Sequence, residues 1–536
     1  MDLRELEHNF KRNTFKNEDD IKIHFHTDIV KPLLDEFNPQ MAGQYRSENV
    51  LKAGGRTDAT FQNISFELKK EGYFSKKPGV KEALYGRDGT DHGLYDYIIS
   101  NADIDGKDDI DTKIKKILSG IGVGFDGQKF LFARFIPSPQ KEQLNTSKVK
   151  VDVSEPLNLR FIYEEKDFQT GLKRLVLLLK QTDKMSLSKQ TLCAVIHPKS
   201  DYVRNSISVI YAALEDNLNP SGNFNSRVKT LYDEWDRVFG TMYGEDEEAT
   251  DFTEVSSKIR EMYGIDGSRE IDSKRYLFSM QTFFNIFLKL LVYSFLAQLV
   301  DPMFTTRREF TKDEINRLFD GDTDDSSRLV NNFFESHFLE WFTFTADIAS
   351  PESSFDVALI NETAAVVNKF NLSTFVLRPE NVQDILQEVY MGLIPQEMRH
   401  LMGEYFSPDW IVEHALDMAG YNGGIDKKLI DPTAGSGPFL TQSIKRIIQQ
   451  KGGILTKPDI VKITHNVIGF DINPISVVSA KANYILIMFS AFFDNCDEEF
   501  GESVSIPVFI ADSILAPVVY SEENDDTLKL GTTVGD

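Results

Sequence analysis

The sequence predicts an α/β protein in which two sheet-containing parts are joined by a mainly helical connector. Late in the chain, apolar strand-like stretches end in acids and alternate with helical patterns, an order typical of a parallel sheet. Early in the chain, a helical pattern precedes a stretch in which apolar and polar residues alternate, as they do in a strand. Helix-like spacing dominates between the two. We therefore expect three domains, at 1–150, 151–395 and 396–536.

The composition limits where a nucleic acid could bind. The chain has 536 residues, of which 41% are apolar, so it can form several sizeable cores. Its net charge is −24, from 59 basic and 83 acidic residues. Proteins gain affinity for DNA when Lys and Arg release counterions from the phosphates. A DNA partner therefore requires a basic surface that is local, or one that another part of the enzyme supplies.

Cysteine usage and the apolar stretches indicate a cytoplasmic protein. Cys193 and Cys496 are far apart in sequence and suggest neither a disulfide framework nor a zinc site. Residues 1–20 are polar and charged, unlike a secretory signal. The most apolar stretch, 282–300, is long enough to suggest a membrane span. It contains Asn285 and Lys289, so we expect a buried helix and no membrane.

In the first domain, a helical pattern over 21–37 leads to a group of charged residues. In a strand over 64–69, Glu67 and Lys69 point to one face while the apolar residues point to the other. Asp58 lies on the neighbouring strand across a short turn. Two carboxylates attract a hard dication such as Mg²⁺, which binds phosphate oxygens and acidifies water. The lysine can orient that water.

This arrangement resembles the PD-(D/E)XK nuclease core. The resemblance implies that Asp58, Glu67 and Lys69 are catalytic and that Asp58 and Glu67 hold the metal. Thr57 stands where the family has proline. The alternative is an ordinary exposed strand that carries a Glu-Lys pair. In this family the preceding helix often adds a further acid, and four candidates remain open: Glu18, Asp28, Glu36 and Glu48.

Further elements follow from periodicity and turn signals. We expect a helix over 81–100 and a hairpin over 121–136 that turns at Asp126-Gly127. The acid-rich runs 103–111 and 320–325 lack the EF-hand spacing, so we interpret them as solvated loops. Helical spacing in the connector predicts helices at 175–180, 203–218, 224–243, 255–263 and 333–342.

The stretch 429–440, which reads Leu-Ile-Asp-Pro-Thr-Ala-Gly-Ser-Gly-Pro-Phe-Leu, predicts a ligand site. An apolar strand ends at Asp431, a glycine turn follows, and a helical pattern begins after it. Gly435 and Gly437 can adopt backbone angles closed to other residues, so a ligand can approach the main chain. The new helix offers free amide groups and its positive dipole end. Such turns bind nucleotides at the carboxyl ends of parallel strands.

Two more strands follow the same pattern, ending at Asp471 and just before Asp512. The stretch 403–408, Gly-Glu-Tyr-Phe-Ser-Pro, precedes the glycine turn. In this order, over 402–515, the motifs resemble the S-adenosylmethionine half of the gamma-type adenine DNA methyltransferases. The resemblance implies a Rossmann-like fold that binds S-adenosylmethionine. The alternative is a nucleotide-like fold without a methyl donor. The implied cofactor-binding residues are Glu404, Tyr405, Phe406, Ser407, Asp431, Thr433, Gly435, Gly437, Asp471 and Asp512.

The resemblance also divides the work among the acids. Asp471 is expected to accept hydrogen bonds from the ribose hydroxyls, because it ends the second strand. By resemblance to the family, Asp512 would face the adenine amino group. Asp431 would act near the methionine end, with the residues 404–407 closing over it.

One motif of the family has no counterpart here. Amino-methyltransferases carry an Asn/Asp-Pro-Pro-aromatic loop that accepts hydrogen bonds from the target amine, and the sequence contains no Pro-Pro pair. We therefore expect a partial methyltransferase domain that binds its cofactor incompletely and does not methylate alone. A C-terminal part or a specificity subunit would supply the missing loop and much of the basic surface.

Together the resemblances imply a restriction-modification protein similar to type IIG and type I-like enzymes. It would join a magnesium-dependent endonuclease to a site-specific adenine DNA methyltransferase, with double-stranded DNA as its partner. One alternative is a modification-only methyltransferase with a relic nuclease. Another is a non-catalytic subunit that binds DNA or senses S-adenosylmethionine.

Overall fold

The computed structural model divides into two compact units, Met1–Asp183 (unit 1) and Lys184–Asp536 (unit 2). The described residues are 2–37, 39, 42–50, 56–87, 91–105, 107–149, 155–180, 184–243, 252–266, 270–304, 309–319, 329–334, 337–345, 355–372, 385–401, 404, 407–495, 503–513, 518–519 and 529–530.

Unit 1 begins with helices. A π-helical turn joins two α-helices, so the helix predicted over 21–37 exists but begins earlier, at Glu18. Asn17 caps this start, because its side chain accepts the Asp20 amide hydrogen at 3.0 Å. The elements are α1 (Leu3–Lys11), α2 (Glu18–His24), η1 (Phe25–Val30), α3 (Lys31–Phe37) and the short η2 (Ala42–Gln44).

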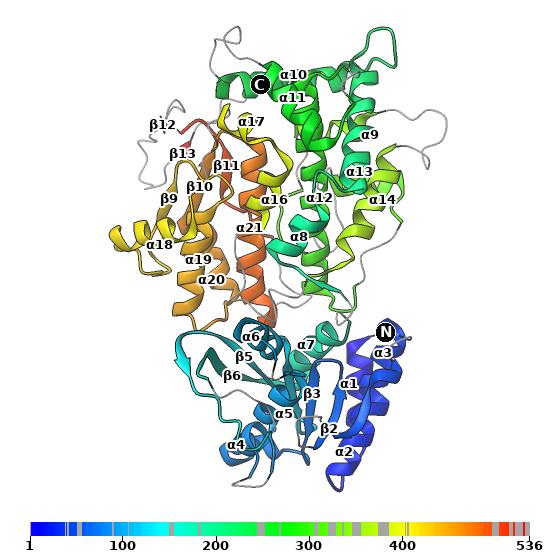
Figure 1. Cartoon of the computed structure of the whole chain (residues 1–536), viewed down its shortest axis with the longest axis vertical. Helices are drawn as coiled ribbons and strands as arrows, with labels where there is room; N and C mark the ends of the chain where they lie inside the picture. Colours follow the sequence, from blue (N-terminus) through cyan, green and yellow to red (C-terminus); the bar gives the residue numbers. More distant parts are fainter. Residues whose placement is uncertain are drawn as a thin grey trace. The chain divides into compact units, whose positions relative to one another are not determined.

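A six-stranded sheet in the order β1-β2-β3-β4-β5-β6 forms the body of unit 1 (Figure 1). Its strands pair antiparallel except for β3 and β4. The hairpin predicted at Asp126-Gly127 is present between β4 and β5, and Gly127 has a φ of +82°. The strands are β1 (Arg46–Val50), β2 (Arg56–Phe61), β3 (Ile64–Leu68), β4 (Ile121–Phe125), β5 (Lys129–Glu142) and β6 (Leu157–Asp167).

The helix predicted over 81–100 is wrong in its middle. Two helices occupy this range, α4 (Lys77–Tyr85) and α5 (Leu94–Asn101). Gly86 ends α4 with a φ of +72°, and a Cβ there would lie 2.1 Å from the Asp91 carbonyl oxygen. The chain therefore turns where the apolar spacing suggested continuity. The remaining elements of unit 1 are η3 (Tyr73–Ser75), α6 (Ile110–Ser119) and α7 (Phe168–Lys180).

Unit 2 begins with the helical region, built around the long helix α12 (Ser273–Val300). Helices predicted at 175–180, 203–218, 224–243 and 255–263 are present in the chain as α7, α9, α10 and α11. The helix predicted over 333–342 is instead a bend followed by a 3₁₀ turn from Phe338. The elements are β7 (Met185–Ser186), α8 (Lys189–Val195), α9 (Asp201–Leu218), α10 (Ser226–Tyr243), α11 (Phe252–Tyr263), α13 (Lys312–Phe319), η6 (Phe338–Phe344), α14 (Phe355–Val367), β8 (Phe370–Asn371), α16 (Ile385–Leu393) and α17 (Gln396–Leu401).

Two helices of unit 2 are long and apolar enough to cross a bilayer, but both lie in its interior. They are α12 and the helix that begins at Pro474, and 89% and 94% of their most apolar windows are buried. Asn285 and Lys289 of α12 are fully buried. The expected buried helix over 282–300 is therefore confirmed.

The second sheet has the parallel order β11-β10-β9, as the three strand-acid patterns predict. Helices α19 and α21 pack against β10 and against each other, which places the strand ends and the helix starts at one edge (Figure 1). The elements are α18 (Asp409–Met418), β9 (Leu429–Asp431), α19 (Pro438–Gln450), α20 (Lys457–Asn466), β10 (Val467–Asp471), α21 (Pro474–Phe492), η9 (Phe493–Asn495), β11 (Val508–Ile510), β12 (Val518–Val519) and β13 (Lys529–Leu530).

Candidate functional site

The glycine turn of unit 2 connects β9 to α19 in a left-handed conformation. Gly435 has a φ of +54° and Gly437 a φ of +87°, angles that favour glycine. The Ala434 amide donates to the Phe470 carbonyl at 2.7 Å, which ties the turn to the end of β10. Pro438 then starts α19, where its missing N–H costs no helical hydrogen bond. The amino end of α19 is thus fixed beside two strand ends.

The two glycines of the turn face different surroundings. A Cβ on Gly437 would lie 3.1 Å from the Cβ of Ala480, so this glycine allows α19 to pack on α21. A Cβ on Gly435 would meet nothing within 4 Å. Gly435 therefore lines open space where a ligand could approach the backbone, while Gly437 also serves packing.

Asp471 holds the turn from the end of β10. Its Oδ2 accepts the Gly435 amide hydrogen at 2.7 Å, and its Oδ1 accepts that of Asn473 at 2.8 Å. Burial raises the pKa of this carboxyl group despite the two donors. Each oxygen keeps a second lone pair, so Asp471 can still accept a further donor from a ligand.

Asp431 ends β9 with one carboxylate oxygen unused. Its Oδ1 accepts the Thr433 amide hydrogen at 3.2 Å, whereas its Oδ2 is buried and lacks a partner among the described residues. Burial, and to a smaller extent the charge of Asp471, raise the pKa of Asp431. An orphaned carboxylate oxygen is costly unless a ligand satisfies it.

Glu404 joins the same group from the preceding segment. Its Oε1 accepts the Tyr390 hydroxyl at 2.9 Å and also the Asn473 side-chain amide. Its Oε2 is buried without a partner in the described part of the chain. Burial raises the pKa of Glu404 to about 8, and Asp471 adds to the shift. The sequence patterns did not single out Tyr390, which no local motif marks.

These three carboxylates favour a ligand with positive charge. Arg399 acts on Glu404 and lowers the pKa of its carboxyl group, but burial outweighs this effect. Burial raises the pKa of all three carboxyl groups, so a cationic ligand would stabilise their ionised forms. S-adenosylmethionine carries a sulfonium and an ammonium group, so the residues present fit this cofactor.

The other predicted cofactor residues are placed less completely. Ser407 is half-buried and Thr433 is exposed. The Ala511 amide donates to the Asp471 carbonyl at 3.0 Å, so Asp512 follows at the same edge of the sheet, half-buried. Tyr405 and Phe406 lie outside the described residues.

Unit 1 brings the predicted nuclease residues together. Ala59 pairs with Phe66, and extending this register by one residue sets Asp58 opposite Glu67 on one sheet face. Lys69 Nζ lies 2.6 Å from Glu67 Oε1, as the alternation predicts. Asp58 Oδ2 accepts the Leu68 amide hydrogen at 2.6 Å. Burial raises the pKa of Glu67 to about 8, against the opposing effect of Lys69.

The structure distinguishes among the four further acids. Glu18 at the start of α2 lies 4.0 Å from Lys69 Nζ and 3.2 Å from Lys22 Nζ. Asp28 instead contacts His24 at 2.8 Å, Glu36 is exposed, and the Glu48 side chain lies outside the described residues. Among the three candidate acids whose side chains are described, Glu18 is therefore the nearest to the cluster.

Lys22 is a member of this cluster that the sequence patterns missed. Its Nζ lies 2.8 Å from Asp58 Oδ1. Burial alone would lower the pKa of Lys22, but the carboxylates of Asp58 and Glu18 raise it. Lys22 and Lys69 thus lie among three acids, Glu18, Asp58 and Glu67, and each lysine contacts at least one of them. A cavity of 370 Å³ opens beside Lys22 and Asp58.

The donor set for a metal is small. Among the described residues, no group of three or more His, Cys, Asp or Glu side chains is arranged to hold a metal ion. Mg²⁺ commonly keeps several waters and takes only one or two protein carboxylates. Asp58 and Glu67 fit that requirement, provided that Mg²⁺ displaces the ammonium groups that contact them.

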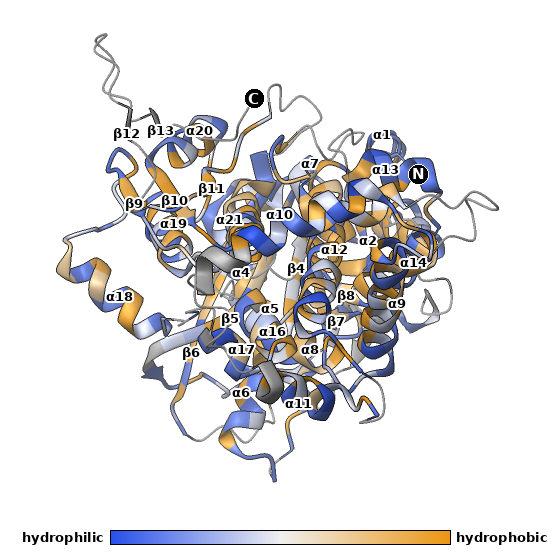
Figure 2. Ribbon diagram, turned by 90° about the horizontal axis from the view of Figure 1, so that it is seen from above, coloured by the Kyte–Doolittle hydropathy of each residue, from blue (hydrophilic) through white to orange (hydrophobic). Residues whose placement is uncertain are grey.

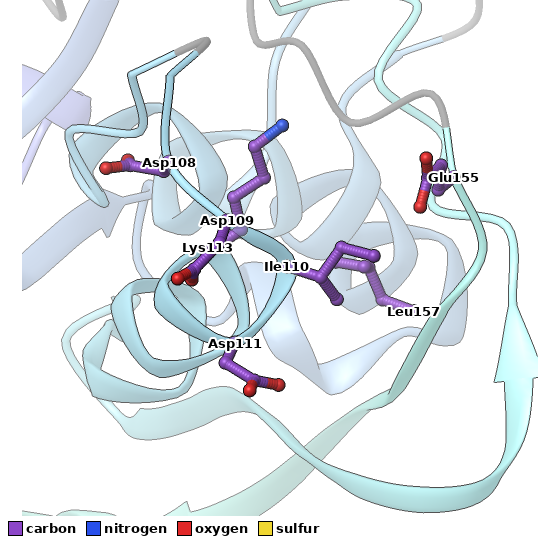
Figure 3. Close-up of a pocket in the computed structure, with 7 residues that line it drawn as sticks. All are labelled: Asp108, Asp109, Ile110, Asp111, Lys113, Glu155 and Leu157. Carbon is purple, nitrogen blue, oxygen red and sulfur yellow. The ribbon is translucent and has the colours of Figure 1, made fainter.

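A second cavity of unit 1 carries acids without such convergence. It has a volume of 620 Å³, and Figure 3 shows the carboxylates of Asp108, Asp111 and Glu155 pointing in different directions. Asp108 already pairs with Lys116 at 2.7 Å, and Asp109 caps α6 through the Thr112 amide. This arrangement agrees with a solvated loop.

The parallel strands, the glycine turn and the buried acids define a nucleotide-type cofactor site of an α/β domain. Residues 381–527 match the family model of the N-6 DNA methylases, so this part of the chain is an N6 adenine DNA methyltransferase domain. Such a domain implies S-adenosylmethionine as its methyl donor. The match contains the whole segment 402–515, with all of the predicted cofactor-binding residues, and excludes unit 1.

No curated protein matches the chain. Among the solved structures that match the chain are two with low TM-scores and low sequence identities. A DrdV–DNA complex has a TM-score of 0.33 and 11% identity, covering 95% of this chain and 40% of that one. A nuclease-deletion mutant of the type ISP restriction-modification enzyme LlaGI, bound to a DNA substrate mimic, has a TM-score of 0.27 and 13% identity. The match covers 66% of this chain and 23% of the LlaGI chain.

Proposed function

We propose that this chain is a restriction-modification protein that joins an adenine-specific DNA methyltransferase to a magnesium-dependent DNA endonuclease. The proposed methyltransferase activity rests on the group of buried carboxylates around the glycine turn. These residues lie inside the segment that matches the N-6 DNA methylases. The second activity rests on the face shared by Asp58, Glu67 and Lys69. Double-stranded DNA would be the substrate of both.

In the methyltransferase, S-adenosylmethionine would supply an electrophilic methyl group. Asp471 holds the glycine turn and would accept the ribose hydroxyls through its remaining lone pairs. Asp431 and Glu404 would face the positively charged part of the cofactor with their free oxygens. Asp512 would contact the adenine group. We further propose that methyl transfer requires an additional part that supplies the target-binding loop, since no Pro-Pro pair occurs here.

In the nuclease, Asp58 and Glu67 would hold Mg²⁺, which supplies Lewis-acid chemistry at a phosphate. Lys69, 2.6 Å from Glu67, would orient the attacking water and lies where it can donate a proton or a hydrogen bond. Glu18 would complete the acid set from α2. Lys22 would leave Asp58 when the metal binds, and its charge would then be free for a phosphate.

Cleavage of supercoiled plasmid with Mg²⁺ tests the nuclease. Wild type, Asp58→Ala and Lys69→Ala are compared with Lys70→Ala, an exposed lysine just beyond the end of β3. We expect cleavage by wild type and Lys70→Ala, and a loss of at least about 100-fold in the other two, the usual scale for general acid-base groups. Equal cleavage by all four would remove Asp58 and Lys69 from the mechanism. Failure of all four would favour the relic nuclease.

Calorimetry with S-adenosylmethionine and S-adenosylhomocysteine tests the methyl-donor site. Binding by the wild-type chain is expected, whereas transfer of labelled methyl groups to DNA by this chain alone is not. Binding accompanied by a change in DNA affinity, but without any transfer after a downstream part is added, would favour the sensing subunit. Absence of binding would contradict the proposed methyltransferase.

A further inference from the structure

Glu404 is held at one oxygen and left open at the other. Tyr390 and Asn473 both donate to Oε1, while Oε2 is buried and has no partner among the described residues. A ligand can therefore form a hydrogen bond or an ion pair with this carboxylate only from the side of Oε2. The two donors come from different elements, α16 and the start of α21, so the position of Glu404 depends on how these elements pack.

The orientation of Asn473 follows from its hydrogen bonds. It is the N-cap of α21, and its Oδ1 accepts the Ile475 amide hydrogen at 3.1 Å. The amide nitrogen must therefore face Glu404, because only Nδ2 can donate. The backbone amide of Asn473 donates to Asp471, which in turn accepts from Gly435. A continuous hydrogen-bonded path thus runs from Glu404 to the glycine turn.

The hydroxyl of Tyr390 is placed from the helical region. Its side chain is buried, and its ring centroid lies 5.5 Å from that of Phe284 on α12. Ring packing rather than the loop around Glu404 therefore sets the position of this donor. Tyr390 thus links α16 to the Glu404 carboxylate, while the Glu404 amide donates to the Arg399 carbonyl of α17 at 2.9 Å.

We propose that Tyr390 and Asn473 are positioning residues that hold Glu404 as the anionic anchor for the positively charged part of the methyl donor. This inference rests on the proposed methyltransferase function of unit 2. The anchor would bind the ammonium group, which S-adenosylmethionine and S-adenosylhomocysteine share, or the sulfonium group, which only the former carries.

The anchor makes cofactor binding depend on pH. Burial raises the pKa of Glu404 to about 8, so the free protein holds a proton there at neutral pH. A cation binds the ionised form, and affinity should therefore rise as pH increases through this value. The titratable groups that act on Glu404 are Tyr390 from α16, Arg399 from α17 and Asp471 from β10, beside the hydrogen bond from Asn473. Tyr390 and Arg399 lower its pKa, and Asp471 raises it.

The first variant removes the hydroxyl alone. Tyr390→Phe deletes a donor to the ionised carboxylate, so the pH midpoint of binding should move upward. Calorimetry on the full chain between pH 6 and 8.5 should show S-adenosylhomocysteine affinity about tenfold lower at pH 7, the scale of one hydrogen bond to a charged group. Tyr263→Phe is the matched control, because its buried hydroxyl donates to the Leu393 carbonyl at the end of α16, 2.6 Å away. It should leave the pH midpoint unchanged.

The second variant, Glu404→Gln, removes the charge with little change in shape. It should weaken binding and abolish the pH dependence over this range. A loss of affinity for both ligands would show that Glu404 contacts the ammonium group. A loss of affinity for S-adenosylmethionine alone would show that it contacts the sulfonium group.

Three outcomes would overturn the inference. Unchanged affinity and midpoint in Tyr390→Phe would remove Tyr390 from this role. Equal losses in Tyr390→Phe and Tyr263→Phe, with no shift of midpoint, would show that both tyrosines only stabilise α16. Binding by Glu404→Gln with a wild-type pH profile would remove the anchor itself. No binding by the wild type would instead contradict the proposed function, and the inference with it.

Discussion

At the scale of single residues, the glycine turn separates packing from ligand approach. Gly437→Ala places a Cβ 3.1 Å from Ala480 in a left-handed conformation, so we expect it to lower the free energy of unfolding by about 1–3 kcal/mol. Gly435→Ala meets open space and should cost about 1 kcal/mol, yet it should weaken S-adenosylhomocysteine binding. Urea unfolding and calorimetry measure the two effects.

Gly452→Ala serves as the control for this pair. It has a φ of +73° and nothing within 4 Å of an added Cβ, so its backbone strain resembles that of Gly435 outside the turn. It should lose similar stability and keep full affinity. Equal affinity in Gly435→Ala and Gly452→Ala would mean that the ligand does not approach Gly435.

Lys22 is the residue whose removal should help a metal to bind. Its ammonium occupies Asp58 Oδ1 at 2.8 Å and lies 3.2 Å from Glu18, so a dication must displace it. Lys22→Met should therefore raise the Mg²⁺ affinity by roughly tenfold, which corresponds to an ion pair of about 1–1.5 kcal/mol. Calorimetry with MgCl₂ measures this. Lys11→Met, which breaks a pair with Glu7 on α1, should leave the affinity unchanged, and a weaker affinity in Lys22→Met would contradict competition.

At the scale of elements, the sequence predicted the turns and strands that neighbouring residues determine. The hairpin at Asp126-Gly127 and the parallel strands ending in Asp431 and Asp471 follow from turn chemistry and strand-acid order, and the structure contains them. The prediction of one helix over 81–100 is wrong because the spacing of apolar residues does not indicate where the chain reverses direction. Gly86 makes that reversal possible, since a Cβ would meet the Asp91 backbone.

The site residues that the sequence did not reveal are brought in by tertiary packing. Lys22 contacts Asp58 from a helix that lies well before it in the sequence, and the helical pattern does not tell which charged residue faces the sheet. For the same reason the sequence left Glu18 as only one of four candidate acids. Tyr390 reaches Glu404 from a different helix through ring packing. Alternation could place Glu67 and Lys69 together because both lie on one strand.

The contact between α12 and η6 contains a fully buried ion pair. Lys289 pairs with Glu340, whose Oε1 also accepts the Asn285 amide at 2.8 Å. Removing one partner leaves an uncompensated buried charge, so Lys289→Met should lower the free energy of unfolding by about 3–5 kcal/mol. Urea unfolding measures it. The double variant Lys289→Met/Glu340→Gln should recover part of this loss, and a double variant as unstable as the sum of both single variants would argue against the pair.

At the scale of the whole molecule, hydrophobic side chains at the surface of the second sheet indicate where unit 2 is less completely covered. Ile430 on β9 and Trp410 and Met418 on α18 are 55%, 68% and 78% exposed. Figure 2 shows hydrophobic residues alternating with polar ones along α18. Within the described sheet β9 pairs only with β10, so its other edge has no strand partner there.

The two units each possess a core and a proposed ligand, so the unfolding of the chain should report them separately. S-adenosylhomocysteine at 100 times its Kd should stabilise the transition of unit 2 by about 2.7 kcal/mol, and Mg²⁺ should stabilise that of unit 1, because each binds one folded unit. Lys289→Met should lower only the transition that S-adenosylhomocysteine raises. Differential scanning calorimetry of the full chain measures both transitions. A single transition that both ligands raise would mean that the units unfold as one, and a ligand that raises the other unit's transition would contradict its assignment.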